Sequence, residues 1–344
     1  MLSTQTATPV HHAAPDHEPP AALRAAGIVA VLSIAIAVVA IAFALPAARS
    51  KPHDVPIGAA GPQAATSQVT ELLEQQAPDA FAVTYYPGEK ALREAILNRN
   101  VYGGIAFGPQ GPTLLTATGG SPAVAQLLTQ IGNGIAAHQG VPLHTEDLAP
   151  PASQDPRGTG LAASALPITL AGILPAAALV LILRREVWTR LIAAIVFSAV
   201  AGTTVAALLQ YVFGSIDSNF WGVAGGLTLG IAAAGLTVLG LGSLFGKAGL
   251  GVGAALALLL GNPLAGLTAA PEMLPAGWGQ LGQLLPQGAT ATLLRSTAYF
   301  GGAGADLAII VLSCWVLAGL TLVIIAALRR PASSAHMMRL RGTR

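Results

Sequence analysis

The residues best able to do chemistry in this sequence gather in one short charged segment. Arg184, Arg185, Glu186 and Arg190 lie in a single stretch that also contains Trp188. Exposed charges can recognise complementary charges on a partner, and an indole ring is a common anchor at protein interfaces. The segment therefore predicts a docking site for another protein. The alternative is a pair of helix ends held at lipid headgroups by arginine.

The motifs that would bind a nucleotide or a metal are incomplete. Residues 242–248 resemble a phosphate-binding loop, but the glycine spacing is one residue short and Ala248 stands where Ser or Thr should hold magnesium. His11, His12 and His17 have neither a fixed geometry nor accompanying carboxylates for a metal. We therefore expect no catalytic, cofactor-binding or metal-binding residues, and we do not expect the chain itself to be an enzyme.

The composition is that of a membrane protein. Of the 344 residues, 53% are hydrophobic and 9% are charged, whereas about a quarter of the residues of a soluble globular protein carry charge. The formal net charge of +2 is too small for a nucleic-acid-binding protein. The single cysteine, Cys314, excludes an internal disulfide and any paired-cysteine site.

Apolar segments long enough to cross a bilayer, about 20 residues of helix, occur six times. They are residues 25–45, 161–183, 191–213, 221–244, 248–267 and 307–328. The first segment is longer than the core of a secretory signal, so we interpret it as an uncleaved span, with a signal as the alternative. The centres of the six segments contain no ionisable residue. This argues against a proton relay, a voltage sensor and an intramembrane enzyme.

The positions of the basic residues predict the orientation. Arg184, Arg185, Arg190, Arg329 and Arg330 all lie on one side of the proposed membrane, and basic residues favour the cytoplasmic side. Both termini are therefore predicted to be cytoplasmic. Residues 1–24 and 329–344 form cytoplasmic tails, residues 46–160 an extracellular domain with its linker, and residues 161–328 a five-helix transmembrane region.

The segment between the first two spans has the pattern of a small α/β domain. Strands are predicted at residues 53–59, 80–86, 101–107 and 113–118, and helices at residues 64–76, 89–99 and after Ser121, which is the expected N-cap. Residues 138–160, which are rich in proline, glycine and acids, are predicted to be an irregular linker.

Glycines recur at every fourth position in the fourth and fifth predicted spans. They are Gly222, Gly226 and Gly230, followed by Gly249 and Gly253. Residues four apart share one helix face, so these rows allow another helix to approach closely. Packing within one bundle is the simpler interpretation, and a dimer seam or a sliding face is the alternative.

An apolar stretch interrupted by prolines lies before the last span, at about residues 264–291. The residues that mark it are Asn262, Pro263, Glu272, Pro275 and Pro286. Because the prolines prevent one continuous helix, we expect short helices that enter the outer leaflet and return, with Trp278 at interfacial depth. This segment is the predicted re-entrant region.

Together these features resemble the membrane subunits of ABC-2-type exporters, in particular the YhgE/Pip-like branch. The residues that carry the resemblance are 101–107 (VYGGIAF), 157–160 (RGTG) with Leu166 and Pro167, 261–264 (GNPL) and 285–288 (LPQG). It covers roughly residues 20–330. The resemblance implies a half-transporter that forms a homo- or heterodimer of permeases in the lipid of a bacterial plasma membrane. It also implies that ATP is used by a separate cytoplasmic ATPase, which contacts a coupling helix at residues 184–190.

The leading expectation is therefore the permease of an ATP-driven exporter that moves a hydrophobic or amphipathic substrate outward. The alternative is a non-transporting membrane protein whose outer domain binds a cell-surface partner or supports a secretion machine.

Overall fold

The computed structural model describes residues 20–109, 111–140, 142–267 and 269–329. His11, His12 and His17, and nearly all of the predicted C-terminal tail, lie outside these ranges. Within the described chain, five helices are long and apolar enough to span a membrane. They cover Ala21–Ala48, Thr159–Ile182, Val187–Val212, Phe220–Gly261 and Asp306–Leu328. The chain is therefore an α-helical membrane protein.

The first of these helices, α1 (Ala21–Ala48), is a separate unit over residues 21–41. Its 28 residues make a helix about 42 Å long, which exceeds the roughly 30 Å of a bilayer core. The part from Ala42 onward belongs to the second unit, which contains all other elements.

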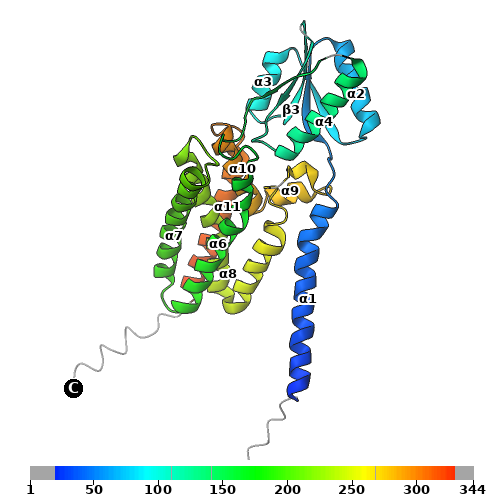
Figure 1. Cartoon of the computed structure of the whole chain (residues 1–344). Helices are drawn as coiled ribbons and strands as arrows, with labels where there is room; N and C mark the ends of the chain where they lie inside the picture. The colour runs from blue at the N-terminus through cyan, green and yellow to red at the C-terminus, as the bar shows by residue number, and fades with distance from the viewer. Residues whose placement is uncertain (1–19, 110, 141, 268, 330–344) are drawn as a thin grey trace, which may run out of the picture. The chain divides into compact units, whose positions relative to one another are not determined.

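The fourth and fifth predicted spans follow each other directly as two helical segments joined by a sharp reversal of the chain. They comprise α8 (Phe220–Ala255) and the π-helical turn η2 (Leu256–Gly261), and the break lies at Gly246, where φ is 64° and ψ is −138°. A Cβ atom built on Gly253 would lie 3.2 Å from Val238, although residues 15 apart in a straight helix are about 22 Å apart. The chain therefore reverses direction at Gly246, and the two halves of α8 pack side by side (Figure 1).

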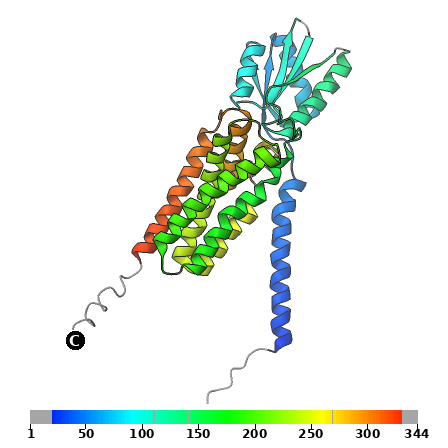
Figure 2. The ribbon, with the colours of Figure 1, turned by 60° about the vertical axis from the view of Figure 1, so that its left-hand side comes forward.

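Glycine allows α8 to be the central helix of the bundle. It packs against α6 (Ala165–Ile182), α7 (Val187–Ala207), α10 (Pro286–Tyr299) and α11 (Asp306–Leu328). A Cβ on Gly319 would lie 2.5 Å from the carbonyl carbon of Leu236, closer than real contacts allow. Such close approach gains packing contacts in a membrane, where lipid is as apolar as the helices. Figure 2 shows α11, in orange and red, running along this bundle.

Four shorter elements complete the bundle. The turn α5 (Thr159–Ala163) leads into α6, the π-helical turn η1 (Leu208–Val212) extends α7, and α9 (Trp278–Gln283) precedes α10. A 3₁₀ turn, η3 (Pro271–Met273), lies between η2 and α9. The expected short helices of the re-entrant region are thus present as η3, α9 and α10, and the last extends beyond the predicted end at about residue 291.

The insertion folds as a five-stranded sheet in the order β2-β1-β3-β4-β5. Its strands are β1 (Val55–Ala60), β2 (Phe81–Tyr86), β3 (Gly103–Gly108), β4 (Gly111–Thr116) and β5 (His144–Asp147). β1 pairs in parallel with β2 and β3, β3 and β4 are antiparallel, and β5 is parallel to β4. The prediction of an irregular linker was wrong at β5, because a short polar edge strand lacks the alternating apolar pattern used to recognise strands.

Helices cover both faces of this sheet. α2 (Gln63–Gln76) and α4 (Pro122–Gln139) pack on one face and α3 (Glu89–Leu97) on the other (Figure 1). The predicted N-cap of α4 is confirmed, because the Ser121 hydroxyl accepts the Val124 amide at 3.4 Å. α3 ends two residues before its predicted end, which leaves Arg99 outside the helix.

The linker back to the bundle is fixed by one buried carboxylate, Asp155. Its two oxygens accept hydrogen bonds from the amides of Thr159 and Gly160 at 2.9 and 2.8 Å and from the hydroxyls of Thr159 and Ser215 at 2.9 and 2.8 Å. Burial alone would raise the pKa of this carboxyl, but the hydrogen bonds outweigh it and hold the pKa below its ordinary value. The linker is therefore tied to the loop between η1 and α8.

Replacement of Asp155 with asparagine should lower the free energy of unfolding by about 1–2 kcal/mol at pH 7. Because the pKa is depressed in the folded state, the contribution is complete above the unfolded-state value of about 4 and is lost as pH falls through the folded-state value. Unfolding of wild type and Asp155→Asn, measured from pH 7 to pH 3, should therefore converge at low pH. A difference that is constant over this range would contradict the assignment.

Candidate functional site

A large cavity lies where the α/β domain meets the segments that precede α11. Its volume is about 680 Å³, which is within the usual range for a small-molecule site. Its walls come from the end of α3, the segment just before β3, η3, α9 and α10, together with the first turn of α11. We call it the junction cavity.

Arg99 lies in this cavity because of how α3 ends. The Arg99 amide donates to the Ile96 carbonyl and the Asn100 amide to the Ala95 carbonyl, both at 2.9 Å. This is the Schellman pattern, in which the residue after the cap takes a left-handed conformation and is usually glycine. Arg99 has a φ of 61° there. A side chain in this conformation costs about 1 kcal/mol or more, so the arginine occupies a position that its backbone disfavours.

The Arg99 side chain joins the α/β domain to α10. Its Nη1 atom donates to the Thr292 carbonyl at 3.0 Å and to the Ser296 hydroxyl, and its guanidinium lies 5.3 Å from the centre of the Phe300 ring. Burial lowers the pKa of Arg99, but a guanidinium remains charged at neutral pH. Its Nε and Nη2 atoms make no hydrogen bond with any described residue.

A second link across the cavity joins Tyr102 to Glu272. The Tyr102 hydroxyl donates to the Glu272 carboxylate at 2.8 Å. Burial, and then the negative charge of Glu272, raise the pKa of Tyr102, so the phenol remains a donor at all physiological pH values. Glu272, predicted to lie in the re-entrant region, is thereby held against the α/β domain.

The backbone of η3 is also fixed by the chain that follows α1. The amides of Lys51 and His53 donate to the carbonyls of Met273 and Glu272 at 3.0 and 2.9 Å, and the Ser50 hydroxyl donates to Met273 at 2.7 Å. The re-entrant region is thus bonded to the chain just before β1. Movement of η3 would therefore be transmitted to the α/β domain.

The remainder of the cavity wall is mostly apolar. Ile96 and Val101 line it from the α/β domain, and Leu274 lines it from the segment after η3. Leu284 and Leu307 also line it, and they are 56% and 63% exposed. Because both border on the apolar bundle, the cavity has an apolar opening beside α11. A cavity with a few polar groups and an apolar opening suits a ligand that is itself amphipathic.

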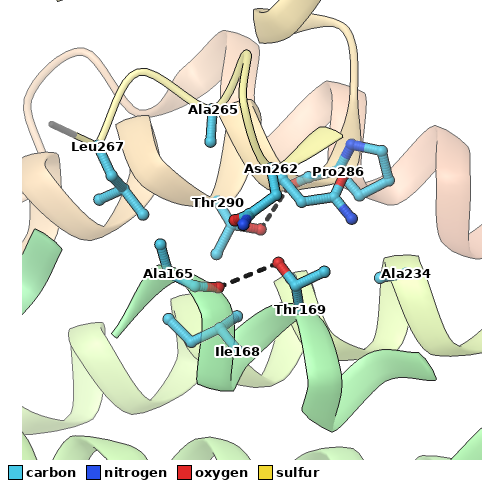
Figure 3. A pocket seen from close by; sticks show the side chains of 11 residues that line it. Ala165, Ile168, Thr169, Ala234, Asn262, Ala265, Leu267, Pro286 and Thr290 are labelled. Carbon is cyan, nitrogen blue, oxygen red and sulfur yellow. Dashed lines mark hydrogen bonds between the residues drawn. The ribbon is translucent and has the colours of Figure 1, made fainter. Parts of the chain in front are cut away.

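A smaller crevice lies inside the bundle and is shown in Figure 3. It is lined from α6, α8, the segment after η2 and α10, and its volume is only about 10 Å³, enough for about one water molecule. The Thr169 and Thr290 hydroxyls there donate to carbonyls of their own helices at 3.0 and 2.6 Å (Figure 3). The crevice is too small for a substrate and is a feature of helix packing.

The predicted charged segment is a corner between two helices. α6 ends at Ile182 and α7 begins at Val187, so Arg184, Arg185 and Glu186 lie in the turn, and Trp188 and Arg190 lie in the first turn of α7. The separate coupling helix expected at residues 184–190 is therefore absent, because α7 takes up its second half. Trp188 is 58% exposed, whereas Arg190 is buried. The exposed surface of the corner thus consists of two arginines, a glutamate and an indole ring.

The predicted glycine rows pack within the chain. A Cβ on Gly230 would lie 2.2 Å from the Thr290 hydroxyl, and one on Gly226 would lie 3.1 Å from Leu293, so this row faces α10. Gly222 approaches the Asn219 side chain, while Gly249 and Gly253 face the first half of α8. The simpler of the two interpretations, close packing inside one bundle, explains Gly226, Gly230, Gly249 and Gly253, whereas Gly222 meets only the residue before its own helix.

The predicted re-entrant residues divide between the two hollows. Glu272 and Pro275 line the junction cavity, and Asn262 and Pro286 line the crevice. Pro263 lines neither.

Sequence reasoning missed two arginines that the structure makes central. Arg99 was expected inside α3, and Arg295 was assigned no role. Arg295 is buried in α10, and its guanidinium donates to the carbonyls of Gly266 and Leu267 at 2.6 and 2.7 Å. Their partners are 28 to 197 residues away along the chain. The only local signal for the position of Arg99 was that it follows a short amphipathic helix.

The fold and the junction cavity define an α-helical membrane protein that carries a small α/β domain on its bundle. Comparison of the chain with protein-family models, with curated proteins and with solved structures found no match.

Proposed function

We propose that the chain is the membrane-spanning subunit of an ATP-driven exporter of the ABC-2 type. It moves a hydrophobic or amphipathic substrate outward, as a homo- or heterodimer, and a separate cytoplasmic ATPase supplies the energy. The observation that carries the proposal is the junction cavity, which offers an amphipathic site beside the apolar bundle. The order of the elements, with one span before the α/β domain and a helical hairpin and broken segment after it, supports the same class.

The proposed topology has six crossings, with α8 and η2 supplying two of them. The corner at residues 184–186 and the linker at Asp155 lie at opposite ends of α6, whose 18 residues are about 27 Å long. If the corner is cytoplasmic, as its arginines favour, the α/β domain and the junction cavity are extracellular. Both termini are then cytoplasmic, in the plasma membrane of a bacterium.

Labelling of single cysteines tests this topology. In a chain in which Cys314 is replaced with serine, a cysteine introduced at the exposed position Gln75 should react with an impermeant maleimide in intact cells. A cysteine introduced at the exposed position Thr189, beside the corner, should react only after the cells are permeabilised. The reverse pattern would overturn the orientation.

The corner is the proposed contact for the ATPase. Its exposed Glu186 can pair with a basic residue of the partner, and the Trp188 ring can fill a pocket on it. Glu186→Lys and Trp188→Ala should each lower substrate-stimulated ATP hydrolysis by about tenfold, the effect of losing roughly 1.4 kcal/mol of interface energy. Membrane insertion should be unchanged, because neither residue is buried in the bundle.

Ile192→Ala provides a matched control for Trp188→Ala. Ile192 is 63% exposed on the same helix but one turn away from the corner, so its removal should leave ATP hydrolysis unchanged. If both corner variants couple as well as wild type, the corner is only a membrane anchor. A chain that binds no ATPase would favour the rival function, a membrane protein whose outer domain binds a cell-surface partner or supports a secretion machine.

A further inference from the structure

We propose that the junction cavity binds the anionic head group of a single-chain amphiphile, which pairs with the free edge of Arg99 while its alkyl chain lies on the apolar wall. The claim that this amphiphile is the cargo of the exporter rests on the proposed function. The claim that the cavity binds the amphiphile can be tested on the purified chain without an ATPase.

The first reason is the hydrogen-bonding state of Arg99. Its Nη1 atom is already used by Thr292 and Ser296, but Nε and Nη2 have no partner among the described residues. These two atoms form one edge of the planar guanidinium, and this edge matches the two oxygens of a carboxylate or a phosphate. The contacts with α10 therefore hold the arginine so that its second edge is available to a ligand.

A neutral side chain, Gln283, shares a hydrogen-bonding partner with Arg99. Gln283 lines the cavity, and its Oε1 atom accepts the Thr292 hydroxyl at 2.5 Å. Its Nε2 atom is shielded from water and has no hydrogen-bond partner among the described residues. Arg99 binds the Thr292 carbonyl and Gln283 binds the Thr292 hydroxyl, so both side chains contact the same residue of α10. This nitrogen of Gln283 is out of reach of solvent and Gln283 adds no charge to the cavity, so Arg99 supplies the contact with the head group.

The charges around the cavity favour an anion over a cation. Two cations, Arg99 and Arg295, are close enough to repel each other. Both are attracted by the carboxylate of Glu272. That carboxylate already accepts the Tyr102 hydroxyl. His53 and Asp54 also line the cavity, but Asp54 is exposed to solvent, where its charge is screened.

The backbone at Arg99 supports a role for its side chain. A glycine would satisfy the Schellman turn without strain, whereas arginine there adopts a left-handed backbone conformation that its side chain disfavours. Strained positions of this kind are found where a side chain is required by function. The apolar opening at Leu284 and Leu307 then indicates that the anion carries an alkyl chain, which can enter beside the bundle.

Photo-crosslinking tests the proposal directly. The full-length chain is placed in nanodiscs of zwitterionic lipid and exposed to a photoreactive dodecyl phosphate. The probe should label the peptides that contain Ile96–Tyr102 and Pro271–Leu284. Labelling should be displaced by unlabelled dodecyl phosphate or by laurate, but not by inorganic phosphate or dodecyltrimethylammonium at the same concentration.

Four variants localise the effect. Arg99→Gln should weaken labelling at least about tenfold, because a charge-assisted pair is lost, and Arg99→Lys, which retains the charge without the planar edge, should be intermediate. Glu272→Gln, which still accepts the Tyr102 hydroxyl, should label as strongly as wild type or more strongly. Lys90→Gln removes the same charge from an exposed position on α3 and should have no effect.

Several outcomes would overturn the proposal. They are equal labelling of Arg99→Gln and Lys90→Gln, displacement by the cationic amphiphile, and equal displacement by inorganic phosphate, which would indicate a site for a free anion. ATP-driven export without labelling at the cavity would refute this inference and leave the proposed function in place. Labelling at the cavity in a chain that couples to no ATPase would support this inference and refute the proposed function.

Discussion

Replacement of Gly249 with alanine should lower the free energy of unfolding of the helical bundle by about 2 kcal/mol, whereas the same replacement at Gly251 should raise it slightly. Both residues lie in the second half of α8, so both gain up to about 1 kcal/mol of helix propensity. A Cβ on Gly249 would lie 2.0 Å from the Leu241 carbonyl oxygen, while one on Gly251 meets nothing within 4 Å. Because the obstacle is backbone, the helices must separate, at a cost of about 1–3 kcal/mol beyond the propensity gain.

Equilibrium unfolding of the two variants in detergent measures this difference. The clash exists only because α8 doubles back at Gly246, so the pair also tests whether the fourth and fifth predicted segments are two antiparallel helices. Equal stability of Gly249→Ala and Gly251→Ala would mean that α8 continues straight through Gly246. The second half of α8 would then not pack beside the first half.

Replacement of Arg295 with methionine should have a comparable or larger effect, a loss of about 3 kcal/mol. Arg295 is 4% exposed, and its guanidinium binds the carbonyls of Gly266 and Leu267. These carbonyls lie in an irregular segment that no helix or strand satisfies, and each buried carbonyl without a partner costs about 1–3 kcal/mol. The arginine therefore holds the backbone that leads into η3.

Proteolysis of the re-entrant region and thermal unfolding would both report this loss. Gln280→Met is the matched control, since Gln280 is exposed on the neighbouring helix α9. Arg295→Lys should recover part of the stability, because an ammonium reaches only some of the same acceptors. If Arg295→Met is as stable as Gln280→Met, the arginine does not support this segment.

The sequence predicts those parts of the molecule that depend on local pattern. The apolar segments, the Ser121 cap and four of the five strands each depend on residues that lie next to one another in the sequence. The glycine rows also predicted close helix contact, although the spacing alone did not identify the partner helix. That partner is α10 for Gly226 and Gly230, and it follows them by about 60 residues.

The junction cavity could not be predicted in this way. Arg99, Glu272 and Gln283 come from three separate elements, and they meet only because the α/β domain packs on the segments before α11. Arg99 reaches the cavity through a left-handed turn that is usually made by glycine, so the residue type concealed the turn. β5 was missed because it is short and polar and pairs only along one edge.

The central claim is tested most directly by ATP-dependent transport in reconstituted vesicles. The chain is purified together with the proposed ATPase and inserted into vesicles, and the vesicles are loaded with dodecyl phosphate as the trial cargo. We predict that ATP, but not a non-hydrolysable analogue, drives the amphiphile to the side of the α/β domain, and that Trp188→Ala abolishes most of this movement while Ile192→Ala does not. No ATPase in the purified complex, or movement of no amphiphile of any head-group charge when ATP is hydrolysed, would contradict the exporter function.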